Sequence, residues 1–137
     1  KERMECYLRS YGNYGERPSF RHAPATDTAD AERFSDFASA PVLYAAFLRS
    51  HVATLSADVR LPDLDVDARK LFFLAYCLML CSAGAADFED EAGTRWHSVL
   101  NPEQRCNVPL MHMVQFASAF SCTHDDYMNP PKRCSFW

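Results

Sequence analysis

The chain has 137 residues, of which 48% are hydrophobic and 13% aromatic, and this is enough for one domain with an apolar core but not for two. The net charge is −4 and residues of opposite charge are interspersed, so the sequence offers no electrostatic footprint for nucleic acid or for an anionic membrane. We therefore exclude nucleic-acid binding and predict a single domain over residues 1–137.

Residues 1–25 alternate tyrosines with polar residues and contain Gly12, Gly15, Pro18 and Pro24. Because glycine and proline interrupt regular backbone structure, we predict an extended, loop-rich segment here and no long helix.

Residues 26–84 carry the pattern of helices, and we predict three. In the first, TDTADAERFSDFASA, a threonine or an aspartate can cap the N-terminus and acidic residues occupy the first turn. The second begins near Pro41, since the first turn of a helix tolerates proline, and its apolar residues recur at helical spacing.

The third predicted helix follows Asp65 or Asp67, either of which can cap it, and we expect it to end near Gly84. It is apolar nearly all round from Leu71 to Cys81, which predicts a position at the centre of the core. The apolar run falls short of the roughly 18 to 20 residues that span a bilayer, so we predict no insertion into a membrane.

Residues 85–109 show neither helical nor strand periodicity and contain Gly93, Pro102 and Pro109. We predict an irregular surface loop for them, of a length that is often functional. Residues 110–137 are predicted to form a short helix, HMVQFASAFSC, followed by a tail without regular structure.

Six cysteines lie at irregular spacing, and none belongs to a paired C-x-x-C. This pattern favours disulfide bonds over a structural zinc site and indicates an oxidising compartment. The sequence shows no signal peptide, as expected for a mature secreted chain, so we predict a secreted, extracellular protein.

A family resemblance rests on five stretches, which occur in this order: ECYLRSYGNY, LPDLDVDARKLFFLAYCLMLC, CNVPLMHMVQF, FASAFSC and MNPPKRCSFW. Together, from about Glu5 to Trp137, they resemble the C-terminal part of the neprilysin and endothelin-converting-enzyme family of zinc metallopeptidases. The resemblance implies a mainly α fold: a compact, disulfide-stapled helical domain like the C-terminal part of that family's catalytic domain, with long irregular loops.

The same resemblance implies a bond between Cys6 and Cys134, because the family cysteines that match them are bonded to each other. Such a bond would close nearly the whole chain into one loop and would hold down the apolar tail that ends in Phe136 and Trp137.

Four cysteines remain, and the resemblance does not pair them. The family partners of the cysteines that match Cys81 and Cys122 lie in an N-terminal part that this sequence lacks, and Cys77 and Cys106 match no standard family cysteine. We predict the bonds Cys81–Cys122 and Cys77–Cys106, and the crossed pairing stays open.

The family's catalytic chemistry depends on H-E-x-x-H, which aims two imidazoles at one zinc ion and places a glutamate beside the bound water. This motif is absent from the sequence. The five histidines stand apart, and none lies four residues from another: His22, His51, His97, His112 and His124.

The family's third zinc ligand is a glutamate in a Glu-Asn-Ile-Ala-Asp-Asn-Gly-Gly run, and the best match here is TDTADAER. Thr26 stands in the place of that glutamate, and Glu32 and Arg33 replace the two glycines. Asp30 matches the aspartate that orients a zinc-binding histidine in the family. We therefore predict that the chain binds no metal and needs no cofactor.

His97 resembles the family histidine that stabilises the oxyanion, and Arg105 resembles the arginine that holds the substrate carbonyl. Two extra residues separate them compared with the family pattern. A donor to an oxyanion accelerates nothing without a nucleophile, so we read His97, Arg105 and Asp30 as family remnants in a protein that is not an enzyme.

We expect the chain to act by binding, and thereby inhibiting, an extracellular protein, for example of a host defence or clotting cascade. Small secreted inhibitors are often built as densely bridged domains. The predicted contact residues lie in the two irregular segments and are Arg95, Trp96, Phe88, Arg17 and Phe20.

Two alternatives stay open. The chain could be the C-terminal piece of a zinc metallopeptidase that needs a separate N-terminal polypeptide, to which Cys81 and Cys122 would bond. It could also be a degenerate paralogue without a specific partner. The sequence gives no prediction of the oligomeric state.

Overall fold

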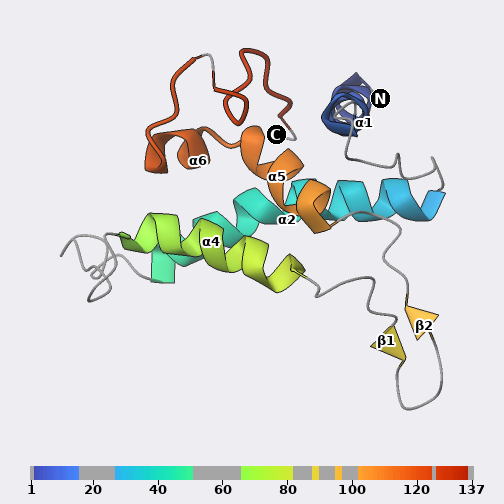
Figure 1. The fold of residues 1–137 in the computed structure, drawn as a ribbon, viewed down its shortest axis with the longest axis horizontal. Coiled ribbons are helices and arrows are strands. Elements are labelled where there is room, and N and C mark those ends of the chain that lie inside the picture. Colours follow the sequence, from blue (N-terminus) through green and yellow to red (C-terminus); the bar gives the residue numbers. More distant parts are fainter. Residues whose placement is uncertain are drawn as a thin grey trace.

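A computed structural model describes residues 2–15, 27–50, 66–81, 88–89, 95–96, 102–124 and 126–135 of the chain. Its elements are mainly helical, which confirms the predicted fold class (Figure 1). In chain order they are α1 (Glu2–Gly15), α2 (Asp27–Ser50), α4 (Ala68–Leu80), β1 (Phe88–Glu89), β2 (Arg95–Trp96), α5 (Pro102–Met111) and α6 (Val114–Ala119). Over these described ranges, no helix combines the length and the apolar character needed to cross a lipid bilayer.

Helix α1 shows that the prediction of a loop-rich N-terminus is wrong over Glu2–Gly15. Tyr7, Tyr11 and Tyr14 recur at intervals of four and three residues, and all three are buried. This apolar stripe outweighs the cost of Gly12 inside the helix, which is about 1 kcal/mol relative to alanine. Two acidic side chains in the first turn also interact favourably with the helix dipole.

Helix α2 is one continuous helix, so the predicted boundary at Pro41 is wrong. Proline lacks the N–H that would bond the carbonyl of Phe37, and an interior proline costs a helix about 3 kcal/mol. The helix continues because residues on both sides of Pro41 are packed into the core: Phe37, Ala40 and Tyr44 are all buried.

Helix α4 begins where the sequence predicts. Asp67 is its N-cap, and the carboxylate accepts a hydrogen bond of 2.8 Å from the backbone N–H of Lys70. The predicted position of this helix at the centre of the core is correct for only one of its faces: Phe73 and Tyr76 are buried, but four large apolar side chains face outward. These are Leu71, Leu74, Leu78 and Met79, with exposed fractions of 38%, 49%, 72% and 81%.

Helix α5 corrects the prediction of an irregular loop over residues 85–109, of which Pro102 to Pro109 are helical. Pro102 occupies the first position, where a missing N–H costs nothing. Val108 and Leu110 are almost completely buried, so packing rather than local pattern stabilises this helix. Helix α6 lies within the short helix predicted for residues 110–137.

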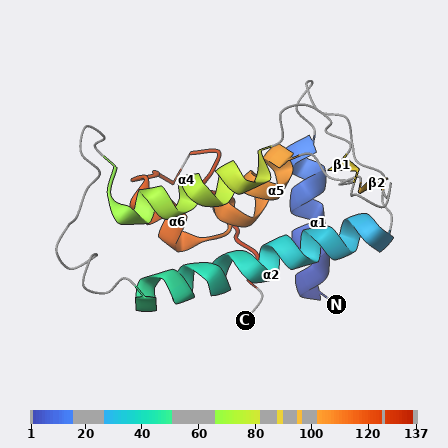
Figure 2. The same ribbon diagram turned by 90° about the horizontal axis from the view of Figure 1, so that it is seen from below.

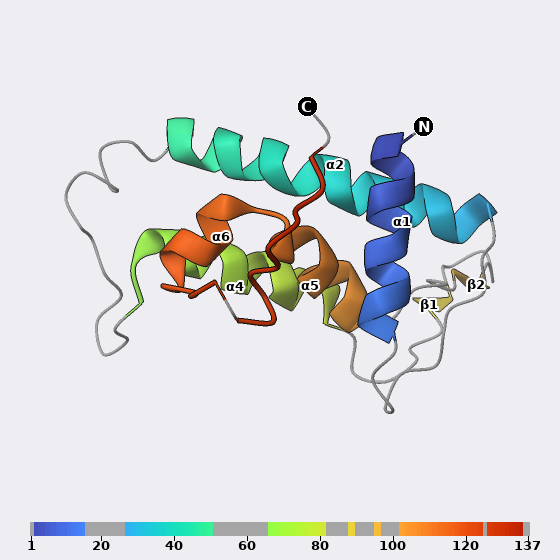
Figure 3. The ribbon, with the colours of Figure 1, turned by 90° about the horizontal axis from the view of Figure 1, so that it is seen from above.

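Helix α5 also joins the two halves of the core, because it contacts α1, α2, α4 and α6. Figure 2 and Figure 3 show α1 crossing α2 on one side of α5, with α4 running beside α2 on the other. One cluster contains the α1 tyrosines, Phe37 and Val108, and the other contains Tyr44, Phe73 and Leu110. The N-terminal half of α2 therefore lies against the tyrosines, and the ion pairs described next are found there.

Candidate functional site

Arg105 on α5 and Asp36 on α2 form a bidentate ion pair. The guanidinium donates from Nε to Oδ2 at 2.8 Å and from Nη2 to Oδ1 at 2.9 Å. The Asp36 side chain is 8% exposed and that of Arg105 is 26% exposed, so the pair is largely shielded from water. The hydrogen bonds to Asp36 are the main cause of a raised Arg105 pKa, and the guanidinium therefore stays protonated.

Asp30 and Arg33 form a second ion pair one turn earlier on α2. Nη1 of Arg33 lies 2.6 Å from Oδ1 of Asp30. The guanidinium carbon lies 5.3 Å from the centre of the Tyr11 ring, within the range of a cation–π contact. Arg33 is buried whereas the Asp30 side chain is 40% exposed, so Arg33 is anchored in the core and Asp30 turns toward it.

Together the two pairs make a polar strip of Asp30, Arg33, Asp36 and Arg105 against the tyrosines of α1. Beside it, the hydroxyls of Tyr7 and Tyr11 are hydrogen-bonded at 2.8 Å. Burial is the main cause of a raised pKa in both tyrosines, and the negative charge of Asp36 raises both further. The strip is a neutral arrangement of two cations and two anions, and both cations already face carboxylates.

This strip contains two of the three family remnants predicted from the sequence. Asp30 and Arg105 each lie in an ion pair, and His97 lies outside the described residues. No ion pair with Arg33 or Asp36 is predicted from the sequence. Their signal is the alternation of charge at positions 30, 33 and 36, because residues three apart are neighbours on a helix surface.

The zinc ion that the resemblance implies does not fit the residues present. Thr26, at the position of the third ligand, offers no carboxylate and lies outside the described residues. The Asp30 carboxylate is already paired with the Arg33 guanidinium. In the part of the chain that the structure describes, no three histidine, cysteine or carboxylate side chains are grouped so that they could hold a metal ion.

The predicted contact residues fall in two places. The antiparallel pair β1–β2 brings Phe88 into register with Trp96 and Glu89 into register with Arg95, so three of the named residues are neighbours in the backbone. In Figure 1 this pair projects below the helices at one end of the fold. Arg17 and Phe20 lie outside the described residues. A role in binding remains a prediction for all five.

Two of the three predicted disulfides are present. Cys6 bonds Cys134 across a separation of 128 residues, and Cys77 bonds Cys106 across 29 residues. The predicted bond Cys81–Cys122 is wrong, because both thiols are free and Cys81 is exposed. Cys81 is the C-cap of α4 and is exposed, whereas Cys77 packs against the core and is bonded to Cys106.

Comparison with known proteins gives a consistent result over the whole chain. The sequence model of peptidase family M13 matches residues 1–136. The chain is 28% identical to neprilysin from Oryctolagus cuniculus over 139 residues, 29% identical to neprilysin-1 from Trittame loki over 140 residues, and 29% identical to membrane metallo-endopeptidase-like 1 from Homo sapiens over 139 residues. These alignments cover 100%, 99% and 100% of the chain but only 18%, 19% and 17% of the relatives. The chain thus spans less than a fifth of the length of these relatives, and no solved structure matches it significantly.

Proposed function

Because this chain belongs to peptidase family M13, we propose that it is a secreted, non-catalytic member of the family, which binds and inhibits another extracellular protein. The observation that carries the proposal is the pairing of Asp30 with Arg33 and of Arg105 with Asp36. Two of the three residues that resemble functional residues of the family, Asp30 and Arg105, are each paired with a charged side chain of this chain.

The first pair works against a metal site. A carboxylate that orients a zinc-binding histidine must have its oxygens directed at an imidazole N–H. Here Oδ1 of Asp30 accepts from Arg33 at 2.6 Å, and Arg33 stands where the family resemblance expects a glycine. Thr26 offers a neutral hydroxyl at the position of the family's carboxylate ligand, so the third ligand of the family's zinc site is missing.

The second pair works against the binding of a substrate carbonyl. Arg105 already donates two hydrogen bonds to a carboxylate that is 8% exposed. Charge-assisted bonds of this kind are roughly twice as strong as bonds to a neutral carbonyl. A peptide carbonyl would have to displace Asp36 and leave its charge buried without a partner.

A protein-binding role is supported by the hairpin formed by β1 and β2. Its register brings Phe88 next to Trp96, and aromatic residues and arginine are enriched at the energetic centres of interfaces. Phe88 and Trp96, with Arg95 beside them, are the residues on which we place the contact. Arg17 and Phe20 belong to the same proposal on the strength of the sequence alone.

Affinity capture from extracellular fluid, followed by binding of the purified partner, tests the proposal. The double variant Phe88→Ala/Trp96→Ala should weaken binding by at least tenfold, and Val42→Ala, an exposed apolar residue on α2, should leave it unchanged. Equal binding by both variants would mean that the partner does not contact Phe88 and Trp96. Peptide hydrolysis by the wild-type chain that stops on addition of a chelator would overturn the non-catalytic assignment.

A second candidate is that the chain is the C-terminal piece of a zinc metallopeptidase that needs a separate N-terminal polypeptide. Two observations favour it. Cys81 and Cys122 are free, and α4 exposes Leu74, Leu78 and Met79 to water, a surface that a further part of the protein could cover. Thr26 and Arg33 count against it, since the third ligand would still be missing.

Counting thiols in the protein isolated from its native source separates the two candidates. If the chain acts by itself, Cys81 and Cys122 should be free, as they are in the structure, and alkylation should label these two cysteines. Disulfides from these two residues to another polypeptide would favour the second candidate.

A further inference from the structure

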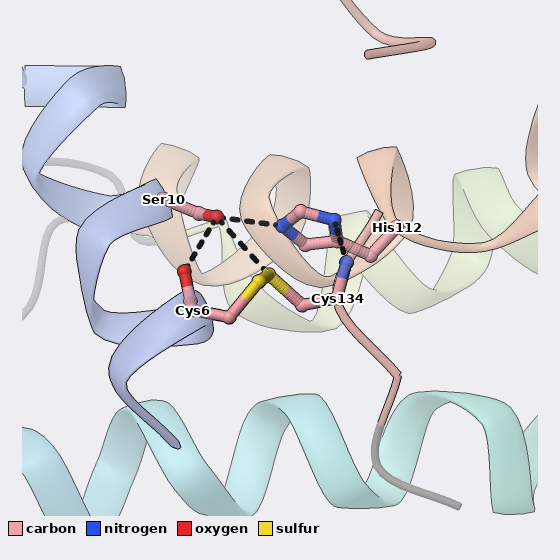
Figure 4. Close-up of a disulfide and its surroundings, with 4 residues drawn as sticks. All are labelled: Cys6, Ser10, His112 and Cys134. Carbon is pink, nitrogen blue, oxygen red and sulfur yellow. Dashed lines mark hydrogen bonds between the residues drawn. A yellow bond between two sulfur atoms is a disulfide. The ribbon is translucent and has the colours of Figure 1, made fainter. Parts of the chain in front are cut away.

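The feature that supports a further inference is a buried histidine beside the Cys6–Cys134 disulfide. His112 lies in the turn after α5 and is 9% exposed. Figure 4 shows its ring between Ser10 of α1 and the backbone of Cys134. Nδ1 lies 3.1 Å from the backbone nitrogen of Cys134, and Nε2 lies 2.9 Å from Oγ of Ser10.

These two contacts define the protonation state of the ring. A backbone N–H can only donate, so Nδ1 of His112 must accept and carries no proton. The proton of the neutral ring is therefore on Nε2, which donates to Oγ of Ser10. The Ser10 hydroxyl in turn donates to the carbonyl of Cys6 at 3.2 Å. A single chain of hydrogen bonds thus connects the C-terminal segment, the turn after α5, and α1.

The neighbours of His112 do not favour a positive charge on the ring. From α1 and α2 the ring meets Tyr7 and Phe37, each with a centroid distance of 6.1 Å. Among the described residues, no carboxylate is hydrogen-bonded to His112. The charged or titratable groups that line the surrounding hollows are Arg133 and Lys132 on the C-terminal segment, Arg9, Glu2, Glu5 and Tyr14 on α1, and Asp126, His124 and Tyr127. Burial, and next the charge of Arg133, lower the pKa of His112 from 6.5 to about 4.

Protons can nevertheless reach the ring. His112 and Ser10 both line an open hollow of about 430 Å³, whose other walls include Tyr14, His124 and Asp126. Water in this hollow can deliver a proton to the ring without unfolding of the chain. A second proton on the ring must go to Nδ1, where it would face the N–H of Cys134.

We propose that Ser10, His112 and Cys134 form an acid-sensitive latch, in which protonation of His112 releases the C-terminal segment 126–135 from the turn after α5. The disulfide is unaffected by acid, so the released segment stays tethered to α1 at Cys6. Acid therefore loosens this edge of the fold and opens the hollows on both sides of Cys134, while the rest of the core is retained.

The direction of the pH effect follows from the lowered pKa. A histidine whose pKa is lower in the closed state stabilises that state fully above about pH 6.5, and this contribution is lost as the pH falls from 6.5 through about 4. With these two values, the closed state should become about twenty-fold less favoured between pH 7 and pH 5. An exposed histidine would cause no such change.

Hydrogen exchange measured by NMR on the wild-type chain tests the latch, with the protection factor of the Cys134 amide as the readout. We expect it to fall about twenty-fold between pH 7 and pH 5, as the His112 ring titrates below pH 5. In His112→Gln, whose amide can accept from Cys134 and donate to Ser10 without titrating, protection should not depend on pH in this range. In the control His124→Gln, which removes the other histidine of the hollow but no hydrogen bond of the latch, protection should still fall between pH 7 and pH 5.

A wild-type protection factor that stays constant down to pH 5, or a His112 ring that titrates near 6.5, would overturn the proposal. If His112→Gln does not fold, Arg133→Gln takes its place. It keeps the ring but removes the neighbouring charge, so the His112 ring should titrate at higher pH and the total loss of protection in acid should be smaller than in the wild type. An unchanged midpoint of the His112 titration in Arg133→Gln would also contradict the latch.

Discussion

The Arg105–Asp36 pair allows a quantitative test, because its two partners differ in exposure. In Arg105→Gln the Asp36 carboxylate, 8% exposed, is left buried without its cation. Breaking a buried pair from one side costs about 3 to 5 kcal/mol, and we expect about 3 kcal/mol here because the pair is not fully enclosed. In Asp36→Asn the arginine side chain is 26% exposed and can be hydrated, so we expect about 2 kcal/mol.

The double variant Asp36→Asn/Arg105→Gln separates the pair from its surroundings. Because neither charge is then left alone, its loss of stability should be smaller than the sum of the single losses, with a coupling energy on the order of 2 kcal/mol. Urea denaturation followed by far-UV circular dichroism gives the free energy of unfolding for each variant, provided that the slope with urea stays constant.

Arg49→Gln is the matched control on the same helix. Arg49 is exposed and lies in the last turn of α2, where a cation contributes about 0 to 1 kcal/mol through the helix dipole. A coupling energy near zero for Asp36 and Arg105, or a loss in Arg49→Gln as large as that in Asp36→Asn, would refute the view that Arg105 is firmly held by Asp36.

Two further changes test the packing and the cross-links. The double variant Cys6→Ala/Cys134→Ala opens a loop of 128 residues and should lose about 5 kcal/mol of unfolding free energy by the loop-entropy relation. Cys77→Ala/Cys106→Ala opens a loop of 29 residues and should lose about 4 kcal/mol. Urea denaturation without reductant measures both losses, and a larger loss for the shorter loop would contradict this order. On α4, Phe73→Ala removes a side chain that is 1% exposed and should lower the free energy of unfolding by about 3 to 5 kcal/mol. Leu78→Ala removes a side chain that is 72% exposed and should lower it by less than about 0.5 kcal/mol. Equal shifts of the urea midpoint in the two variants would mean that the outer face of α4 is covered in solution.

The sequence predicts those features of the fold whose signals are local. Asp67 is a typical N-cap, and the helix after it begins as its pattern predicts. The Cys6–Cys134 bond was implied by the family resemblance rather than by spacing. By contrast, α1 and α5 were missed because Gly12, Pro102 and Pro109 are local signals against a helix. Those signals are outweighed by burial of tyrosines, Val108 and Leu110 against distant segments.

The candidate site was likewise predictable only where a local signal or the family resemblance pointed to a residue. Asp30 and Arg105 could be named from the resemblance, but their partners depend on which face of α2 meets α5, and this is decided by packing. The charges at positions 30, 33 and 36 were visible on one helix, whereas Arg105 lies 69 residues from Asp36 and nothing local links them. The role of His112 could not be predicted, since both of its partners come from distant parts of the chain.

The proposal that this protein lacks metal-dependent catalysis is tested most directly by measuring zinc in the protein purified from its native source, at its native length, together with hydrolysis of a model peptide. The ion pairs of Asp30 and Arg105 predict less than stoichiometric zinc and no hydrolysis above the uncatalysed rate. One tightly bound zinc ion per chain, with hydrolysis that a chelator abolishes, would contradict this account.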